Sequence, residues 1–447
     1  MLSHKLLFAD KIGDIAGYYA DGVDDYYSKE GDAQEWAGKG AEHLGLLGRA
    51  VEQARFQELL LGQIEEGGPS VRVTVRDDSK NRIGIDLTFS APKSVSIFAL
   101  VGNNADMVEA HDLAVKRALE AAEAQAQARV KQHGKTRVEN TGNLVIAKFR
   151  HETTRAQDPE LHTHAIVMNL TRRSDGEWRA LKNDEIVKST KYLGSLYRTE
   201  LANILQSKGY EIRHGRDGLF ELAAISRQQI EAFSQRSAQI EEYLASLGLT
   251  RETASSHAKQ QATLQTRDRK DKEMDRAEIH AQWQQRAREL GIDFDRRTSD
   301  GSASSQELEE FAQQDAASQI EAARRAVRFA IDHLSEREAV ISQSTLMDTA
   351  LKHQLGRTNP AAVYDAVNEF VQAGRLVEET RLYYGAGQNP QTARAEADWI
   401  KAMVDSGETH EVANQRLTEA IQAGALLRRE PRYTTNTAIA RELKVLG

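Results

Sequence analysis

Three histidines carry the most specific chemical signal in this chain of 447 residues. His162 and His164 are two positions apart, so on a β-strand their side chains point to the same face. If the segment that contains His151 pairs with theirs as an antiparallel hairpin, His151 stands opposite His162. Three neutral imidazoles that leave coordination positions open are typical of a catalytic metal site. The pattern therefore predicts a metal ion bound by these three histidines.

The alternative interpretation is a set of unrelated polar histidines at a strand end, because a His-x-His pair alone is a weak signal. The third histidine, on a plausible partner strand, favours the metal site. Imidazole suits zinc, manganese, iron or nickel better than magnesium by intrinsic preference.

Tyrosines form a second cluster. Four of the 12 tyrosines fall within ten residues, as the pairs Tyr18-Tyr19 and Tyr26-Tyr27. Packing at the edge of a core would explain such pairs, and a nucleophile that forms a covalent intermediate is the functional alternative. Because the pKa of tyrosine is about 10, such a nucleophile needs a general base or a substrate polarised by a metal.

Asp86 stands in the middle of an expected strand, GIDLTFSAPKSVS. Aspartate is disfavoured there, so a partner is expected. Holding the second nitrogen of a metal-binding histidine is one use, and accepting a proton from a tyrosine is another. A solvent-facing strand residue is the plain alternative. The loop that follows offers Lys93 to a phosphate.

Several classes of protein are excluded by what the sequence lacks. There is no cysteine, which removes disulfides, thiolate metal sites and cysteine nucleophiles. No P-loop, GxGxxG or HExxH motif is present. No apolar run is long enough for a membrane helix, and the N-terminus lacks the features of a signal peptide. We therefore expect a cytoplasmic protein without membrane insertion.

The net charge of −8 hides an uneven distribution. Residues 1–68 contain 6 Lys/Arg and 13 Asp/Glu, a net charge of −7, whereas residues 129–213 contain 16 Lys/Arg and 10 Asp/Glu, a net charge of +6. The overall negative charge argues against a nucleic-acid partner, but the basic middle of the chain permits one.

The elements that would position these residues are read from periodicity. The first 65 residues read as helices broken by glycine, including one from Ala41 to Glu66. Alternation predicts strands around Val71–Val75 and Ile83–Phe89, and a long helix is expected from Asp106 to Gln132. The histidines fall on two expected strands, Asn143–Glu152 and Leu161–Thr171, with a turn at Asp158-Pro159 between them.

Taken together, the motifs resemble the MobF class of relaxases of conjugative plasmids. The resemblance runs through MLSHKLL, GYYADGVDDYYSKEGDAQEWAGKGAEHLGL, GIDLTFSAPKSVS, HETTRAQDPELHTHAIVMNLT and DGEWRAL, in this order over residues 1–182. Weaker C-terminal pieces resemble the segment that leads into the helicase part of these proteins. No Walker motif follows, so the chain reads as an N-terminal portion of a relaxase–helicase or as a truncated homologue.

The resemblance implies an α+β fold of the HUH-endonuclease type, a central antiparallel sheet flanked by helices. It implies strand-specific nicking of single-stranded DNA at an origin of transfer, with a type IV secretion coupling protein and accessory relaxosome proteins as further partners. His151, His162 and His164 match the metal ligands, for one divalent ion, Mg²⁺ or Mn²⁺, with Zn²⁺ or Ni²⁺ as alternatives. Tyr18, Tyr19, Tyr26 and Tyr27 match the family's tyrosines, with Tyr18 as the nucleophile and Tyr26 as a second nucleophile. Asp86 matches the active-site aspartate.

We expect four regions on this basis: a catalytic core over residues 1–233, a polar helical lid over 234–296, a linker over 297–318, and a mainly helical tail over 319–447. The tail has a helix and strand order that suggests a winged-helix module. DNA contacts are expected from the basic middle, with Trp178 either stacking on a base or packing in the core. The expected contact residues are Lys93, Lys148, Arg150, Arg155, Arg172, Arg173, Trp178, Arg179 and Lys182.

Three alternatives remain at this point. Another tyrosine HUH enzyme, such as a rolling-circle initiator or transposase, shares the metal and tyrosine but usually places its tyrosines after its histidines. A three-histidine metalloenzyme would act on small molecules without a DNA adduct. A non-catalytic DNA-binding module would bind single strands even with the triad replaced by alanine.

Overall fold

The computed structural model describes residues 1–9, 34–65, 71, 82–132, 135–154, 156–250, 252–266, 276–298, 316–385, 392–422 and 425–446. The expected strand around Val71–Val75 is therefore mostly outside the described residues. So are Tyr18, Tyr19, Tyr26, Tyr27 and Arg155.

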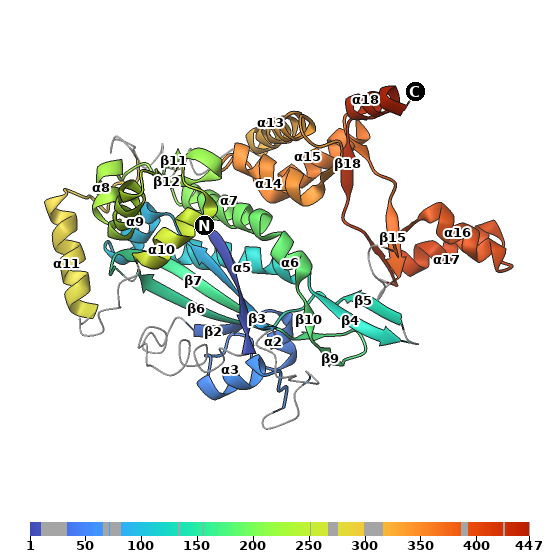
Figure 1. Ribbon diagram of the computed structural model, residues 1–447, viewed down its shortest axis with the longest axis horizontal. Helices are drawn as coiled ribbons and strands as arrows, with labels where there is room; N and C mark the ends of the chain where they lie inside the picture. The colour runs from blue at the N-terminus through green and yellow to red at the C-terminus, as the bar shows by residue number, and fades with distance from the viewer. Residues whose placement is uncertain are drawn as a thin grey trace.

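A five-stranded sheet in which neighbours run antiparallel is the centre of the fold (Figure 1). Its order is β1 (Leu2–Phe8), β3 (Arg82–Ser90), β7 (Pro159–Met168), β6 (Ile146–Thr153) and β2 (Gln34–Ala37). The segment between β1 and β2 thus connects the two opposite edges of the sheet. This arrangement confirms the predicted central antiparallel sheet.

One face of the sheet, which we call the α5 face, packs against three helices. These are α4 (Lys93–Leu100), α5 (Ala105–Glu123) and α7 (Thr190–Ser207). The alternation in β3 explains this contact, because Ile85, Leu87 and Phe89 all point into the core beneath these helices and are fully buried. Burying such side chains contributes about 1.5–3 kcal/mol each relative to exposure.

The opposite face is covered over part of its area by α2 (Lys39–His43) and α3 (Gln53–Leu60), as Figure 1 shows. Phe56 of α3 meets Phe149 of β6 edge to face, with ring centroids 5.3 Å apart, and Trp36 of β2 is buried with them. Phe149 precedes His151 by two residues on the same strand. This second core therefore anchors the strand that carries His151.

Two sequence expectations about local structure are wrong. The first 65 residues contain the edge strands β1 and β2, and the expected helix from Ala41 is divided into α2 and α3. The expected helix to Gln132 ends at Glu123, and β4 (Gln127–Gln132) follows. β4 pairs with β5 (Lys135–Asn140) and β10 (Leu181–Lys182), so pairing within a sheet overrides the helix propensity of these residues.

Short elements complete the described core. Beside the sheet lie β8 (Thr171–Arg172), β9 (Trp178–Arg179), α6 (Asp184–Lys188), β11 (Ile212–His214), the 3₁₀ turn Arg216–Gly218 and β12 (Phe220–Leu222). Four polar helices follow, α8 (Arg227–Ala232), α9 (Gln235–Ser246), α10 (Ser256–Gln265) and α11 (Arg276–Glu289). No helix in the described ranges is long and apolar enough to cross a membrane.

The C-terminal region consists of two strand–helix–helix–strand units, the second inserted in the first. The first contains α13 (Ala316–Ser335), β13 (Ile341–Ser342), α14 (Gln343–His353), α15 (Pro360–Gln372) and β14 (Val377–Glu378), with β18 (Arg432–Thr434) between its strands. The second contains β16 (Arg394–Ala395), α16 (Glu396–Asp405), α17 (His410–Gln422) and β17 (Leu426–Arg428) around β15 (Leu382–Gly385). The chain continues into α18 (Asn436–Leu446). The order of helices and strands, and its repeat, agree with the sequence expectation. The expected wing between β14 and β15 is wrong, because β14 pairs with β18 and β15 pairs with β16 and β17. A winged-helix module stays a prediction.

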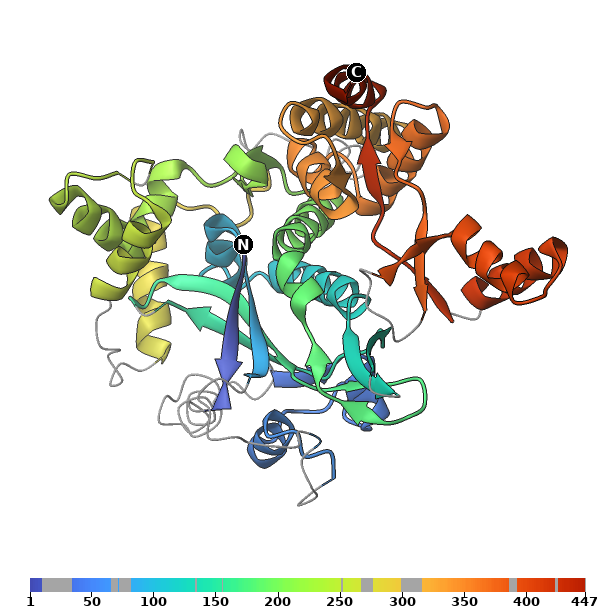
Figure 2. The ribbon, with the colours of Figure 1, turned by 45° about the vertical axis from the view of Figure 1, so that its right-hand side comes forward.

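The first C-terminal unit packs directly on α7 (Figures 1 and 2). Buried Ser195 of α7 donates to Asp348 of α14 at 2.5 Å, and Leu355 belongs to the core of the α5 face. Gly356 has φ +68°, and a Cβ there would lie 2.6 Å from the Gln206 side chain. Any residue other than glycine is therefore disfavoured at position 356, because the backbone conformation suits glycine and no room is left for a Cβ atom.

Candidate metal centre and its surroundings

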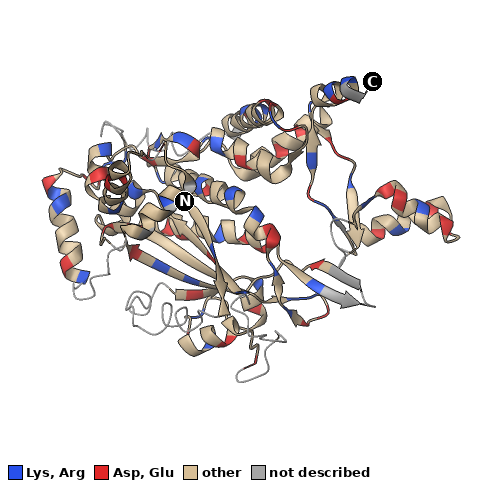
Figure 3. Ribbon diagram, viewed as in Figure 1, with Lys and Arg blue, Asp and Glu red and all other residues tan. Residues whose placement is uncertain are grey.

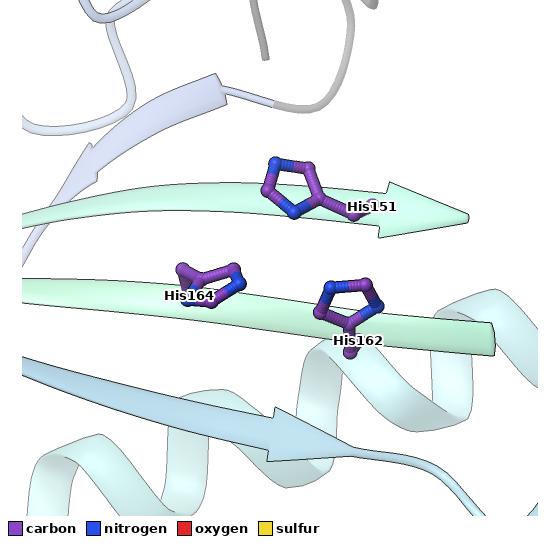
Figure 4. Close-up of side chains that lie close together, drawn as sticks. All are labelled: His151, His162 and His164. Carbon is purple, nitrogen blue, oxygen red and sulfur yellow. The ribbon is translucent and has the colours of Figure 1, made fainter. Parts of the chain in front are cut away.

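The three histidines converge at one end of the central sheet. His151 on β6 is directly opposite His162 on β7, and His164 follows two residues later on the same face. Their ring centroids are 5.1–5.2 Å apart, and one nitrogen from each ring lies within 4.8 Å of the others. Figure 4 shows the three rings gathered over the two strands. We call this side of the sheet the triad face.

Each ring on β7 is oriented by a bond to its Nδ1 atom. The Nδ1 of His162 lies 2.9 Å from the carbonyl oxygen of Glu160, which can only accept, so Nδ1 carries the proton. The Nδ1 of His164 lies 2.8 Å from Oδ2 of Asp86. In both rings Nε2 is therefore the nitrogen left for a metal. Burial lowers the pKa of His162, which keeps this imidazole neutral and able to bind a cation near neutral pH.

Asp86 reaches His164 because of the register between β3 and β7. Thr88 is opposite His164, and Asp86 is two residues from Thr88 on the same face, which places it diagonally beside the ring. The Thr88 hydroxyl donates to Oδ1 of Asp86 at 3.0 Å. Asp86 is 4% exposed. Of the two roles considered for this aspartate, the geometry shows the contact with His164.

This donor set fits a divalent metal ion. It offers three imidazoles, two of them in a tautomer fixed by neighbouring acceptors, on adjacent strands of a well-packed sheet. A carboxylate behind one ligand is the usual support for a metal-binding histidine. With three protein ligands, positions remain for a substrate oxygen, as in catalytic sites.

The tyrosine segment is attached to the sheet at the same end. β2 begins at Gln34, which is opposite Phe149, two residues before His151. Tyr27 precedes Gln34 by seven residues, a stretch that can span about 25 Å at most. The chain that carries the tyrosines therefore re-enters the sheet next to the metal ligands.

Two of the expected DNA-contact residues lie on the other side of the sheet. Lys148 and Arg150 alternate with His151 on β6, so they point to the α5 face. Lys148 forms an ion pair with Glu35, and Arg150 forms one with Asp112 of α5 at 2.6 Å. The expectation that they flank the histidines is corrected, because strand alternation separates side chains that are adjacent in sequence.

Lys93 is also directed inward. Its ammonium group donates to the carbonyl oxygen of Pro159 at 2.8 Å, at the start of β7, and burial lowers its pKa. In this conformation it supports the backbone near the triad. A contact of Lys93 with DNA stays a prediction.

The remaining basic residues lie at the far end of β7. Arg173 pairs with Glu139 at 2.8 Å and with Asp175 at 2.5 Å, and Arg179 pairs with Glu177. Arg172 lies next to them, and the Lys182 ammonium is 3.3 Å from Asp184. Trp178 packs against the core under α3. Figure 3 shows that acidic and basic residues alternate along the ribbon in this part of the molecule.

The polar helices meet the turn that joins the two histidine strands. The indole of Trp283 on α11 donates to the carbonyl oxygen of Gln157 at 2.8 Å, and Arg276 pairs with Glu152 at 3.2 Å. Asp158, fully buried in the turn, accepts from Gln235 of α9 at 3.2 Å. Sequence reasoning missed these contacts, since only the fold brings together residues that are 77 to 126 positions apart.

A family model described as TrwC relaxase matches residues 12–290. The chain belongs to the TrwC relaxase family. Two Escherichia coli proteins, each named multifunctional conjugation protein TraI, are 39% identical over 293 residues and 38% identical over 294 residues. Each match covers 63% of this chain and 16% of the relative, so the chain spans only a small part of these curated relatives.

Solved relaxase structures are also similar. One is conjugative relaxase TrwC with OriT DNA in a metal-free form, 57% identical with a TM-score of 0.61, and another is its copper-bound form, 59% identical with a TM-score of 0.62. A further metal-bound complex is 58% identical with a TM-score of 0.61. Each match covers 66% of this chain and the whole of the solved chain. The relaxase fold predicted for the catalytic core is thus confirmed.

Proposed function

We propose that this chain nicks one strand of DNA at a plasmid origin of transfer by metal-assisted tyrosine transesterification. The observation that carries the proposal is the convergence of His151, His162 and His164, with Asp86 behind His164, in a member of the TrwC relaxase family. The solved relatives named as complexes with OriT DNA support the choice of substrate.

The reaction would exchange one phosphodiester for another. The Tyr18 hydroxyl loses its proton and its oxygen bonds to the scissile phosphorus. The bond to the 3′ oxygen breaks, and that oxygen takes up a proton to become a free 3′ hydroxyl. The product is a 5′-phosphotyrosine ester, and Tyr26 is the nucleophile we assign to a second strand transfer. Because the number of phosphodiester bonds is conserved, no nucleotide cofactor is needed.

The residues of the sheet prepare the site for this exchange. A divalent ion held there would draw charge from the phosphate oxygens, acting as a Lewis acid and a template. His151, His162 and His164 supply neutral nitrogen donors. Asp86 and the Glu160 carbonyl hold two of the rings in one orientation. We assign Mg²⁺ or Mn²⁺ as the working ion, because these ions suit phosphate oxygens, with Zn²⁺ or Ni²⁺ as ions that the imidazoles would also accept.

The helices α9 to α11 would act as a lid over the bound strand, since they already contact the turn between the histidine strands. A coupling protein of a type IV secretion system and accessory relaxosome proteins are the further partners we propose, in the cytoplasm. The basic residues Arg172, Arg179 and Lys182 remain candidates for phosphate contacts away from the triad.

The test is a gel assay with labelled single-stranded oligonucleotides that contain the cognate origin sequence. With Mn²⁺, the wild-type chain should form an adduct that survives denaturation, and both chelation and His162→Ala should abolish it. Tyr18→Phe should remove the first cleavage, whereas Lys148→Ala, on the α5 face, should leave it intact. Unchanged nicking by Tyr18→Phe would contradict the assignment of the nucleophile.

A further inference from the structure

The α5 face of the β6–β7 pair carries polar residues that the proposed reaction does not use. Arg150 is opposite Thr163 in the register, and the His151 and His162 pair is the next one along. Because side chains alternate, Arg150 and Thr163 point to the α5 face directly behind the metal ligands. Thr163 is 3% exposed and stands between the two histidines of β7. A bond to the Thr163 side chain therefore holds β7 at the position between its two histidine ligands.

A buried histidine of α5 binds this threonine. His111 is fully buried, its Nε2 lies 2.8 Å from the Thr163 hydroxyl, and its Nδ1 lies 2.8 Å from the hydroxyl of Tyr197 on α7. Burial lowers the pKa of His111 well below its usual value, so the ring is neutral, with one donor and one acceptor. Both are used, and the hydrogen bonds connect α7, α5 and β7 in a line through the core.

The next residue of α5 binds the other member of the strand pair. Asp112 accepts from Arg150 at 2.6 Å. Consecutive residues of one helix thus bind the two residues of one cross-strand pair, one through a buried hydrogen bond and one through a partly exposed ion pair. Packing alone would not require this arrangement, since apolar side chains would fill the same space without the cost of burying polar groups.

Directional bonds at this position bear on the register of the strands. A slip of one residue would turn every side chain of β7 to the opposite face. Apolar residues lie on both faces of β7, with Ala165 and Val167 on one and Ile166 and Met168 on the other. Hydrophobic burial therefore favours the observed register of this strand over a slipped one only weakly. The hydrogen bond at Thr163, which a slip would break, favours the observed register strongly.

We infer that His111 and Asp112 of α5 are positioning residues that fix the metal ligands from behind the sheet, through Thr163 and Arg150. The inference rests on the proposed metal site and extends it to residues that touch neither metal nor DNA. It also gives Arg150 a role different from the DNA contact expected from its charge.

The test compares three threonine variants of the full chain. Thr163→Val removes the hydroxyl without changing the volume, and Thr163→Ser retains it. Thr199→Val is the matched control, because Thr199 on α7 is fully buried and its hydroxyl has no hydrogen-bond partner among the described residues. Mn²⁺ affinity is measured by titration calorimetry, ligand geometry by the EPR spectrum of the Cu²⁺-loaded protein, and stability by thermal unfolding without metal.

We expect Thr163→Val to weaken Mn²⁺ binding about three- to tenfold, less than the roughly 10–100-fold effect of losing a direct partner of a metal ligand. Its Cu²⁺ spectrum should change, whereas Thr163→Ser and Thr199→Val should keep the wild-type affinity and spectrum. If Thr163→Val lowers only the unfolding temperature, the inference is wrong and the cluster is core packing. A wild-type chain that binds neither ion would instead overturn the metal site itself, and this inference with it.

Discussion

The two faces of the β6–β7 pair use neighbouring residues for opposite purposes. On the triad face, His151, His162 and His164 bring nitrogen donors together in a cluster that could hold a metal ion. On the α5 face, one position away on each strand, Arg150 and Thr163 are bonded to a helix. The comparison teaches that the face to which a strand residue points decides whether it can take part in the chemistry. Its charge and its closeness in sequence to the histidines do not.

Replacing a residue on each face should give the largest contrast. His162→Ala removes one of three ligands. Its Mn²⁺ affinity should therefore fall by more than about 100-fold, the largest loss expected when a hydrogen-bond partner of a ligand is removed. Lys148→Ala on the α5 face loses an ion pair that is partly exposed, which is worth about 0–1 kcal/mol of stability. Its Mn²⁺ affinity should not change. Titration calorimetry on both variants measures the difference. Equal losses of Mn²⁺ affinity would mean that the two faces of the sheet do not have separate roles.

Asp86→Asn should have the next largest effect. The amide keeps the shape of the side chain but loses the charge that holds Nδ1 of His164, so metal affinity should fall about 10–100-fold. Asp184→Asn, which alters the partner of Lys182 at the far end of the sheet, is the control and should bind metal normally. An Asp86→Asn variant with wild-type affinity would show that the carboxylate does not support the site.

The stability of the metal-free protein should decrease in mild acid. Burial lowers the pKa of His162 in the folded state, so below the unfolded value of about 6.5 the unfolded chain binds more protons. The free energy of unfolding should therefore fall as the pH drops through that value, by at most about 1.4 kcal/mol per pH unit for this histidine. Urea unfolding between pH 7 and 5.5 measures the slope. His162→Gln should make it shallower, and an unchanged slope would contradict the burial argument.

Arg173→Ala should have the smallest effect, on DNA binding. This guanidinium already pairs with Glu139 and Asp175, so few counterions are released when it meets a phosphate. The slope of log affinity against log salt should therefore change by less than about 0.7, the value for one full contact with a single strand. Arg172→Ala is the comparison, and fluorescence anisotropy over a range of salt concentrations measures both. A change of about 0.7 for Arg173→Ala would mean that its ion pairs open and that it makes a full phosphate contact on binding.

The sequence was sufficient for the triad and for the central strands that carry it. The His-x-His spacing and the turn at Asp158-Pro159 determine one face and one hairpin, both local properties. The alternation around Asp86 likewise indicated its side of β3, although the choice of His164 as its partner required the register of a non-local strand pair.

Other features were out of reach because they depend on tertiary contacts. β4 has the composition of a helix and becomes a strand only by pairing with β5 and β10. The ion pairs of Lys148 and Arg150 were also out of reach, because their acidic partners Glu35 and Asp112 are distant in the chain. A contact of these two residues with DNA stays a prediction. His111 gave no signal, since one histidine in a helix resembles any other until the fold places Thr163 beside it.

Mapping the covalent adduct tests the central claim most directly. The wild-type chain is incubated with the cognate origin strand and Mn²⁺, digested with protease, and the nucleotide-bearing peptide is sequenced by mass spectrometry. The account predicts the nucleotide on Tyr18, with no adduct after chelation or in His162→Ala. An adduct on a residue outside the Tyr18–Tyr27 segment, or equal labelling in the presence of chelator, would contradict it.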